Sequence, residues 1–253
     1  MTTPGQRPSL EITGAIATIS LARADVANRL ELEDLEAIRM HVAKVNGCKE
    51  VMVLRIRAEG KSFCGGFNIG SIGGPQTTAL FEQMVNDVAA ARPVTVAALN
   101  GGLYGGATDL ALSCDFRLGV PECQMFVPAA QFGLLFYRSG MARYVTRLGL
   151  GNAKRILLTG AKLDSNEMLR VGFLDQIVEM EKLAVETDAL SYRLAGMAPL
   201  ALLGMKKYLN QIADGALDIA SCEADIAAAD VSEDLDEGTR AWSMKRKPDF
   251  KGR

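Results

Sequence analysis

The chain has 253 residues, 49% of them hydrophobic and 23% charged, which is enough to bury a large core in one α/β domain with or without an appendage. Its net charge of −2 argues against nucleic acid or an anionic membrane as the main partner, because both need a basic face. No apolar stretch approaches the roughly twenty residues that span a bilayer, and residues 1–8 lack a hydrophobic signal core. We therefore expect a cytoplasmic protein that does not insert into membranes.

Hydrophobic periodicity predicts the elements in chain order. A hairpin is expected over 10–21 and an amphipathic helix over 31–45. The next part alternates between strand 51–57, helix 77–91, strand 94–99, helix 106–113 and strand 115–119. Beyond Pro128 the pattern is helical, with helices expected over 141–148, 151–158, 166–171, 182–196, 200–214 and 216–231. The recurring order of strand, strand and helix predicts a stacked ββα arrangement with ligands at the loop ends.

Two glycine-bearing loops are the strongest functional signal. The first is Gly60-Lys-Ser-Phe-Cys-Gly-Gly-Phe-Asn68 and the second is Asn100-Gly-Gly-Leu-Tyr-Gly-Gly-Ala-Thr-Asp109. Each follows an apolar run rich in β-branched residues, so each is predicted to leave a strand with backbone amides that a ligand can approach. Two such loops side by side could direct two N–H groups at one oxygen, as an oxyanion hole does. The alternative is a pair of tight turns between strand and helix.

Cysteine and histidine usage argues against other classes of site. The five cysteines have no C-x-x-C spacing, which favours reduced, packed thiols over a disulfide framework or a zinc site. The only histidine is His41, so catalytic triads and histidine metal sites are not expected, and no metal is predicted. Residues 232–253 contain a basic cluster and an aromatic residue, which predicts either an interaction or ligand-covering segment or a solvated terminal helix.

The glycine loops also carry a family resemblance. Ser62-Phe-Cys-Gly-Gly-Phe-Asn-Ile69 resembles the first oxyanion loop of the crotonase (enoyl-CoA hydratase/isomerase) superfamily, and Asn100–Asp115 resembles the second. Shorter matches extend the resemblance over nearly the whole chain: Phe126-Val-Pro128, Phe132-Gly133, Leu157–Gly160, Gly172–Asp175, Ala198-Pro199 with Lys206, and Lys245–Phe250. The collective spacing of these segments is specific, although no single segment would suffice.

The resemblance implies an α/β fold with a spiral of ββα turns over residues 1–195 and a helical C-terminal region, 196–253, that mediates trimerisation, often into a dimer of trimers. It implies an acyl-CoA substrate, so coenzyme A enters with the substrate and no separate cofactor is expected. By the same resemblance, the amides of Phe67 and Gly106 hold the thioester oxygen. The other expected substrate contacts are Lys61, Gly65, Gly66, Gly105, Phe136, Lys245 and Lys247. The three lysines would pair with coenzyme A phosphates, unless they are simply solvated.

Two positions depart from the family pattern. Hydratases of the family use two glutamates as general acid and base, but here Asp109 stands at the first position and Ala129 at the second. Asp109 is therefore the candidate acid/base, and Tyr137 is a second candidate catalytic group. The alternative for Tyr137 and its neighbour Arg138 is a contact between subunits.

Three functions remain open on this sequence. The first, which we expect, is a hydratase or isomerase acting on enoyl-CoA with Asp109 as the surviving acid/base. The second is another enolate-forming reaction, such as decarboxylation or carbon–carbon cleavage of an acyl-CoA. The third is a catalytically weak protein that binds acyl-CoA.

Overall fold

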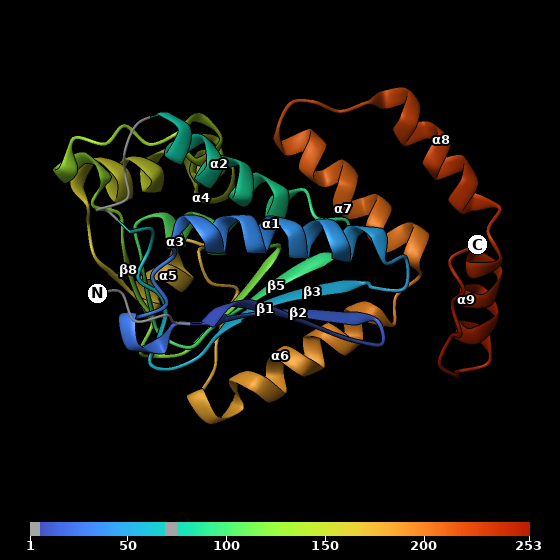
Figure 1. Cartoon of the computed structure of the whole chain (residues 1–253). Coiled ribbons are helices and arrows are strands. Elements are labelled where there is room, and N and C mark those ends of the chain that lie inside the picture. The colour runs from blue at the N-terminus through green and yellow to red at the C-terminus, as the bar shows by residue number, and fades with distance from the viewer. Residues whose placement is uncertain (1–5, 69–74) are drawn as a thin grey trace.

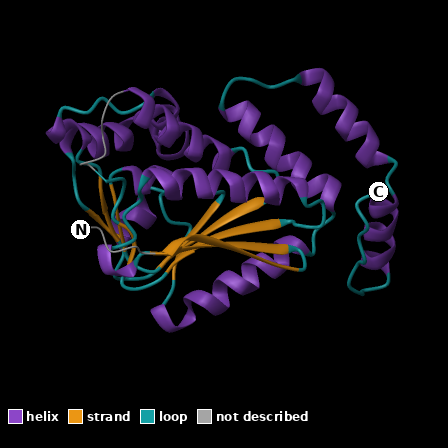
Figure 2. Ribbon diagram, viewed as in Figure 1, coloured by secondary structure: helices purple, strands orange, loops and turns teal. Residues whose placement is uncertain are grey.

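The computed structural model describes residues 6–68 and 75–253 as two β-sheets surrounded by helices (Figure 1). Ile69, the last residue of the first motif, lies outside the described residues. Helix α1 (Leu32–Gly47) covers one face of the larger sheet and α6 (Met180–Ala195) covers the other. Figure 2 shows this layering by secondary structure, with the strands enclosed between helices.

The larger sheet carries the apolar strands that the periodicity predicts. Its strand order is β1 (Gln6–Thr13), β2 (Ile16–Ala22), β3 (Val53–Ala58), β5 (Val94–Leu99), β7 (Phe116–Gly119) and β10 (Gln176–Ile177). The β1–β2 hairpin is antiparallel, and every other neighbouring pair is parallel. All six residues of β5 are buried and five of them are apolar, as is typical of a parallel strand that helices cover on both faces.

The smaller sheet lies at one end of the larger sheet and contains β4 (Ser62–Cys64), β6 (Gly102–Tyr104), β8 (Gln124–Phe126) and β9 (Leu163–Asp164), in that order. Successive units of the chain give one strand to each sheet and then form a helix. These units are β3–β4–α2 (Pro75–Ala89), β5–β6–α3 (Gly106–Ser113) and β7–β8–α4 (Arg138–Thr159). The predicted ββα arrangement is confirmed.

Helix α4 differs from its prediction. Two helices were expected over 141–148 and 151–158, but the structure has one element that begins at Arg138 and bends at Gly149, where φ is +79°. The glycine tolerates this left-handed conformation, so the two predicted helices form two arms of one bent helix. The short helix α5 (Ser165–Arg170) lies close to its predicted position, with Asp164 capping its first turn.

The C-terminal helices α7 (Pro199–Ala213), α8 (Ile219–Asp230) and α9 (Glu233–Ser243) extend away from the sheets (Figure 1). Lys206 fixes α7 to the core, because its Nζ lies 2.7 Å from a carboxylate oxygen of Asp115 and donates to the carbonyl of Pro93 at 2.6 Å. Helix α6 ends at Ala195, where a domain boundary was expected, and the division of the chain there stays a prediction. None of the described helices is both long and apolar enough to cross a membrane.

Candidate active site

The two glycine loops meet where β4 pairs with β6 in the smaller sheet. Their backbones approach so closely that side chains would not fit between them. A Cβ on Gly101 would lie 2.1 Å from the carbonyl oxygen of Lys61, and a Cβ on Gly66 would lie 2.6 Å from that of Tyr104. Asn100 adds a hydrogen bond from its side-chain amide to the Gly60 carbonyl at 2.8 Å. The glycines therefore hold the two loops side by side.

The amide nitrogens of Phe67 and Gly106 belong to the two glycine loops, close to where these loops meet. Leu30 forms a parallel bridge with Phe67, accepting from the amide of Asn68 at 3.0 Å and donating to the carbonyl of Gly66 at 2.8 Å. That pattern turns the N–H of Phe67 away from Leu30. Gly106 opens α3, and its nitrogen lies 3.8 Å from the Cβ position of Gly66. Within residues 6–68 and 75–253, neither amide donates to a protein acceptor.

The turn over 23–30 supports the first glycine loop, and sequence reasoning missed it. The side-chain amide of Asn28 donates to the carbonyls of Glu59 and Ser62 at 2.8 and 2.9 Å. The Gly65 amide donates to the carbonyl of Ala27 at 2.6 Å. Asn28 has φ of +53°, a conformation that asparagine tolerates better than most residues, so an asparagine just before a predicted helix was the available signal.

Asp109 lies in the first turn of α3 with no exposed surface, and two side chains hold its carboxylate. The Tyr137 hydroxyl donates to Oδ2 at 2.5 Å. Arg143, from α4, donates from Nε to Oδ1 at 2.9 Å and from Nη2 to Oδ2 at 3.3 Å. Arg143 also donates to the side-chain oxygen of Asn86 at 3.1 Å. The structure thus brings both predicted catalytic residues together and adds an arginine that the sequence analysis did not identify.

These contacts define the electrostatics around the carboxylate. Burial, then the charge of Asp109 and the hydrogen bond to it, raises the pKa of Tyr137 well above the usual value of 10.0. Burial lowers the pKa of Arg143, but the charge and hydrogen bond of Asp109 outweigh burial, so its pKa is raised overall. Tyr137 is therefore a protonated donor and Arg143 a cation at neutral pH. Three of the roughly four acceptor positions of the carboxylate are occupied.

Aromatic rings form a continuous row beside the carboxylate. Phe81 of α2 packs against Phe67 at a centroid distance of 5.9 Å and against Tyr137 at 6.0 Å. Phe136 stacks on Tyr137 at 4.7 Å and contacts Tyr144 edge-on at 5.9 Å. The Tyr144 hydroxyl lies 2.5 Å from that of Thr108, next to Asp109 in α3. We call Phe67, Phe81, Tyr137, Phe136 and Tyr144 the aromatic row. Its member Phe81 was missed by the sequence analysis.

The position of the second family glutamate is apolar in the structure. Ala129 begins a short 3₁₀-helix, Ala129–Phe132, and is 8% exposed. A methyl group there can neither activate water nor deliver a proton. Of the two positions at which the family resemblance places glutamates, only the first therefore holds a carboxylate here, that of Asp109.

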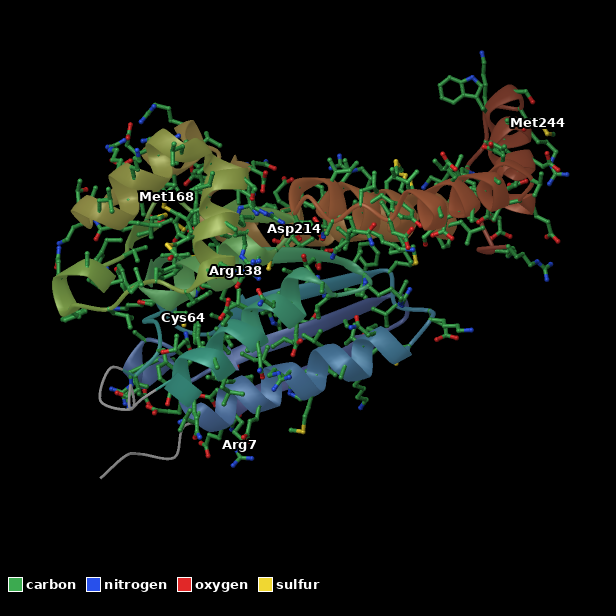
Figure 3. All side chains as sticks on the ribbon, turned by 90° about the horizontal axis from the view of Figure 1, so that it is seen from above. Arg7, Cys64, Arg138, Met168, Asp214 and Met244 are labelled. Carbon is green, nitrogen blue, oxygen red and sulfur yellow. The ribbon has the colours of Figure 1, made fainter. Side chains whose placement is uncertain are left out.

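The charged residues predicted to bind substrate or a neighbouring subunit do not all lie near Asp109 and the two glycine loops. Lys61 is exposed on the first glycine loop. Lys245 and Lys247 follow α9, and Figure 3 shows their neighbour Met244 at the opposite end of the molecule from Cys64, so one chain does not bring these lysines to the loops. Arg138 is exposed and, with Arg143, lines a cleft of about 1590 Å³ between α2, α4 and α7.

Comparison with known proteins agrees with this fold and with the resemblance carried by the two loops. The chain is 28% identical to the crotonyl-CoA hydratase of Syntrophomonas wolfei, over 95% of this chain and 96% of that protein. It is 25% identical to the short-chain-enoyl-CoA hydratase of Clostridium acetobutylicum, over 96% and 97% of the two chains. The crystal structure of enoyl-CoA hydratase from Bacillus anthracis, 23% identical, shares the fold with a TM-score of 0.90 over 98% of this chain and 100% of that chain.

The family model for enoyl-CoA hydratase/isomerase matches residues 11–253, which is almost the whole chain. The resemblance predicted from the sequence is confirmed, and this chain belongs to the enoyl-CoA hydratase/isomerase family.

Proposed function

We propose that the protein is an acyl-CoA enzyme in which the amides of Phe67 and Gly106 form an oxyanion hole for the thioester oxygen and stabilise an enolate. The observation that carries the proposal is the approach of the two glycine loops, with the Gly106 nitrogen 3.8 Å from the Cβ position of Gly66. Donors fixed in place before the reaction stabilise developing charge without reorganisation. Relatives named as hydratases of crotonyl-CoA and short-chain enoyl-CoA support the substrate class.

Asp109 is the proposed acceptor of the α-proton, and Tyr137 orients its carboxylate. Two hydrogen bonds from Arg143 and one from Tyr137 leave about one acceptor position on the carboxylate. Hydration needs water activation as well as proton delivery, and Ala129 supplies neither. A step served by one carboxylate, such as double-bond isomerisation through the enolate, therefore fits these residues better than fast hydration.

A second candidate reaction is cleavage of a carbon–carbon bond of an acyl-CoA, such as decarboxylation. In decarboxylation the bond between the α-carbon and the carboxylate carbon breaks, carbon dioxide leaves, and the electron pair passes to the enolate that the two amides would stabilise. The α-carbon then takes up a proton from water. This reaction needs no base to remove an α-proton. The complete burial of Asp109 and its pairing with Arg143 favour this candidate, because both restrict access of a substrate proton to the carboxylate.

Coenzyme A is proposed to approach along the first glycine loop, where the exposed Lys61 would pair with a phosphate. Gly65, Gly66 and Gly105 are proposed to contact the substrate through the backbone of the two loops, and Phe136 is proposed to border the acyl group. No separate cofactor is invoked. Cytoplasmic localisation stays a prediction from the sequence.

Assembly into a trimer or a dimer of trimers is also proposed. Large apolar side chains are exposed on the extended C-terminal helices, with Trp242 87% exposed and Leu209 and Ile219 also on the surface. Such an apolar surface is typical of a subunit interface. Lys245 and Lys247 would then reach the substrate phosphates in a neighbouring subunit. Light scattering coupled to size-exclusion chromatography tests this assembly, which a monomer would contradict.

Exchange of the α-protons of butyryl-CoA in deuterated water tests the proposed oxyanion hole, because exchange requires the enolate. Gly106→Pro removes one donor at the first position of α3, where a helix tolerates proline. We expect exchange to fall about 100- to 1000-fold. Gly106→Ala is the matched control, since its Cβ would meet the Phe81 ring at 2.4 Å as the proline does, but its N–H remains.

The two variants separate the donor from the steric effect. If exchange by Gly106→Pro and Gly106→Ala is equal, the amide is not a donor to the enolate and the proposed hole is wrong. If the wild-type protein binds butyryl-CoA without exchange and also releases no carbon dioxide from malonyl-CoA, the weak binding protein becomes the better description.

A further inference from the structure

The proposed oxyanion hole has an aromatic side chain directly against one of its two donors. A Cβ on Gly106 would lie 2.4 Å from Cζ of Phe81, and 2.9 and 3.1 Å from its two Cε atoms. The end of the Phe81 ring therefore rests on the backbone of Gly106. Because the thioester oxygen is proposed to bind the Gly106 amide, the acyl carbons beyond it must pass this ring.

Neighbouring rings hold Phe81 in place. The ring of Phe67, in the first glycine loop, contacts the Phe81 ring edge-on at a centroid distance of 5.9 Å. The Tyr137 ring makes the second contact at a centroid distance of 6.0 Å. The Tyr137 hydroxyl is itself fixed at 2.5 Å from Asp109. Phe81 is 5% exposed, so the ring has little free volume into which it could rotate.

From this geometry we infer that Phe81 determines acyl-chain length and restricts the site to short acyl groups. The inference rests on the proposed function and goes beyond it, because it assigns a specificity role to a residue of α2. A short acyl group would end before it had to displace the Phe81 ring. A longer chain would have to displace the Phe81 ring from both Phe67 and Tyr137, and a buried ring in contact on two sides resists displacement.

The side chains of the aromatic row favour binding of an apolar acyl group. The rings of Phe67, Phe81 and Phe136 offer carbon surfaces. The two hydroxyls of the aromatic row, on Tyr137 and Tyr144, are engaged by Asp109 and Thr108. A carboxylate or sugar at the end of the acyl chain would find no free donor on Phe81. The substrate class is thus a short, apolar acyl-CoA.

Binding of saturated acyl-CoA thioesters tests the inference without depending on the reaction. Titration calorimetry with butyryl-CoA and decanoyl-CoA gives the ratio of the two dissociation constants for each variant. The wild-type protein is expected to bind butyryl-CoA at least about tenfold more tightly than decanoyl-CoA, and Phe81→Ala is expected to improve decanoyl-CoA binding about tenfold or more, the scale set by one methylene in a filled pocket. Phe81→Leu, which keeps more buried volume, should shift the ratio in the same direction by less.

Met84→Ala is the matched control. Met84 lies one turn further along α2 and is fully buried, so its truncation loosens the same helix without removing a member of the aromatic row. The ratio for Met84→Ala should equal the wild-type ratio. A shift of the same size in Met84→Ala would attribute the effect to a loosened helix and overturn the inference.

Two other results would also overturn the inference that Phe81 limits acyl-chain length. One is wild-type binding of decanoyl-CoA as tight as that of butyryl-CoA. The other is an unchanged ratio in a folded Phe81→Leu protein, with circular dichroism confirming the fold. The proposed function fails independently, through absence of both α-proton exchange and decarboxylation in a protein whose binding ratio still depends on Phe81.

Discussion

Arg143 and Asp109 form an ion pair across two helices that are far apart in the sequence. Nε of Arg143 lies 2.9 Å from Oδ1 of Asp109, although 34 positions separate the residues. Both side chains are largely buried. The packing of α4 against α3 therefore depends on the same carboxylate that is the candidate acid/base. The proposed base Asp109 therefore has a cation beside it before any substrate binds.

Removing Arg143 is expected to destabilise the fold. Arg143→Gln leaves the fully buried Asp109 carboxylate without its cation, and breaking a buried pair in this way costs about 3 to 5 kcal/mol. Urea unfolding followed by circular dichroism measures the change. The double variant Asp109→Asn/Arg143→Gln should recover much of the loss, because no charge is left buried. Equal losses in the single and double variants would show that the two side chains do not interact.

The exposed pair of Arg170 and Glu167 provides a control for the loss of an arginine. Arg170→Gln removes a salt bridge on the surface of α5, and such pairs contribute little to stability. Its urea midpoint should match that of the wild-type protein within error.

Alkaline pH is expected to destabilise the protein through Tyr137. Burial and Asp109 raise the pKa of Tyr137 well above 10.0, so the folded chain holds this proton more tightly than the unfolded chain. The corresponding stability is complete below about pH 10 and is lost as the pH rises above that value. Urea midpoints between pH 8 and pH 11 should therefore fall less steeply for Tyr137→Phe than for wild type. Exposed Tyr192→Phe should keep the wild-type slope, and equal slopes for all three would contradict the prediction.

Crotonyl-CoA hydration is expected to be slow because Ala129 stands where the family resemblance places a glutamate. A general acid or base typically contributes about 100- to 10,000-fold, so hydration should fall short of a two-glutamate hydratase by that order. Ala129→Glu should raise the rate, measured as loss of the enoyl absorbance, with Ala129→Gln as the control that has the same shape and no carboxylate. Fast hydration by the wild-type protein would show that another group replaces the missing glutamate.

Three cysteines are expected to resist thiol reagents in the folded protein. Burial raises the pKa of Cys64 and Cys114 to about 12 and that of Cys123 to about 11, so almost none of the reactive thiolate exists at pH 8. Cys48 and Cys222 are partly exposed and should react first with a chromogenic disulfide reagent. All five should react in denaturant, since none is in a disulfide. If the native wild-type protein showed a rapidly reacting thiol that the Cys64→Ser variant lacks, the tight packing around the first glycine loop would be contradicted.

The elements that sequence reasoning placed well are those with local signals. The strands β3 and β5 are short apolar runs, and the glycine loops that follow them must have small residues because the two backbones touch. The order of these signals along the chain predicted a stacked ββα arrangement, and the family resemblance added the spiral. The left-handed bend at Gly149 was not predicted, because a single glycine inside a helical pattern does not reveal its φ.

The partners of Asp109 required the tertiary structure. Tyr137 was proposed through the family resemblance, but Arg143 looks like an ordinary polar residue of a helix until α4 packs against α3. Phe81 likewise reads as one more apolar residue of α2, and only the fold places its ring on Gly106. Contacts between distant segments depend on how helices dock, which local periodicity does not encode.

The proposed oxyanion hole requires the amides of Phe67 and Gly106 to donate to the same thioester oxygen. A crystal structure of the protein with butyryl-CoA would show whether they do. We expect the thioester oxygen about 2.7 to 3.1 Å from both amide nitrogens, with the acyl carbons against the Phe81 ring. A bound thioester whose oxygen contacts neither amide would rule out the proposed oxyanion hole.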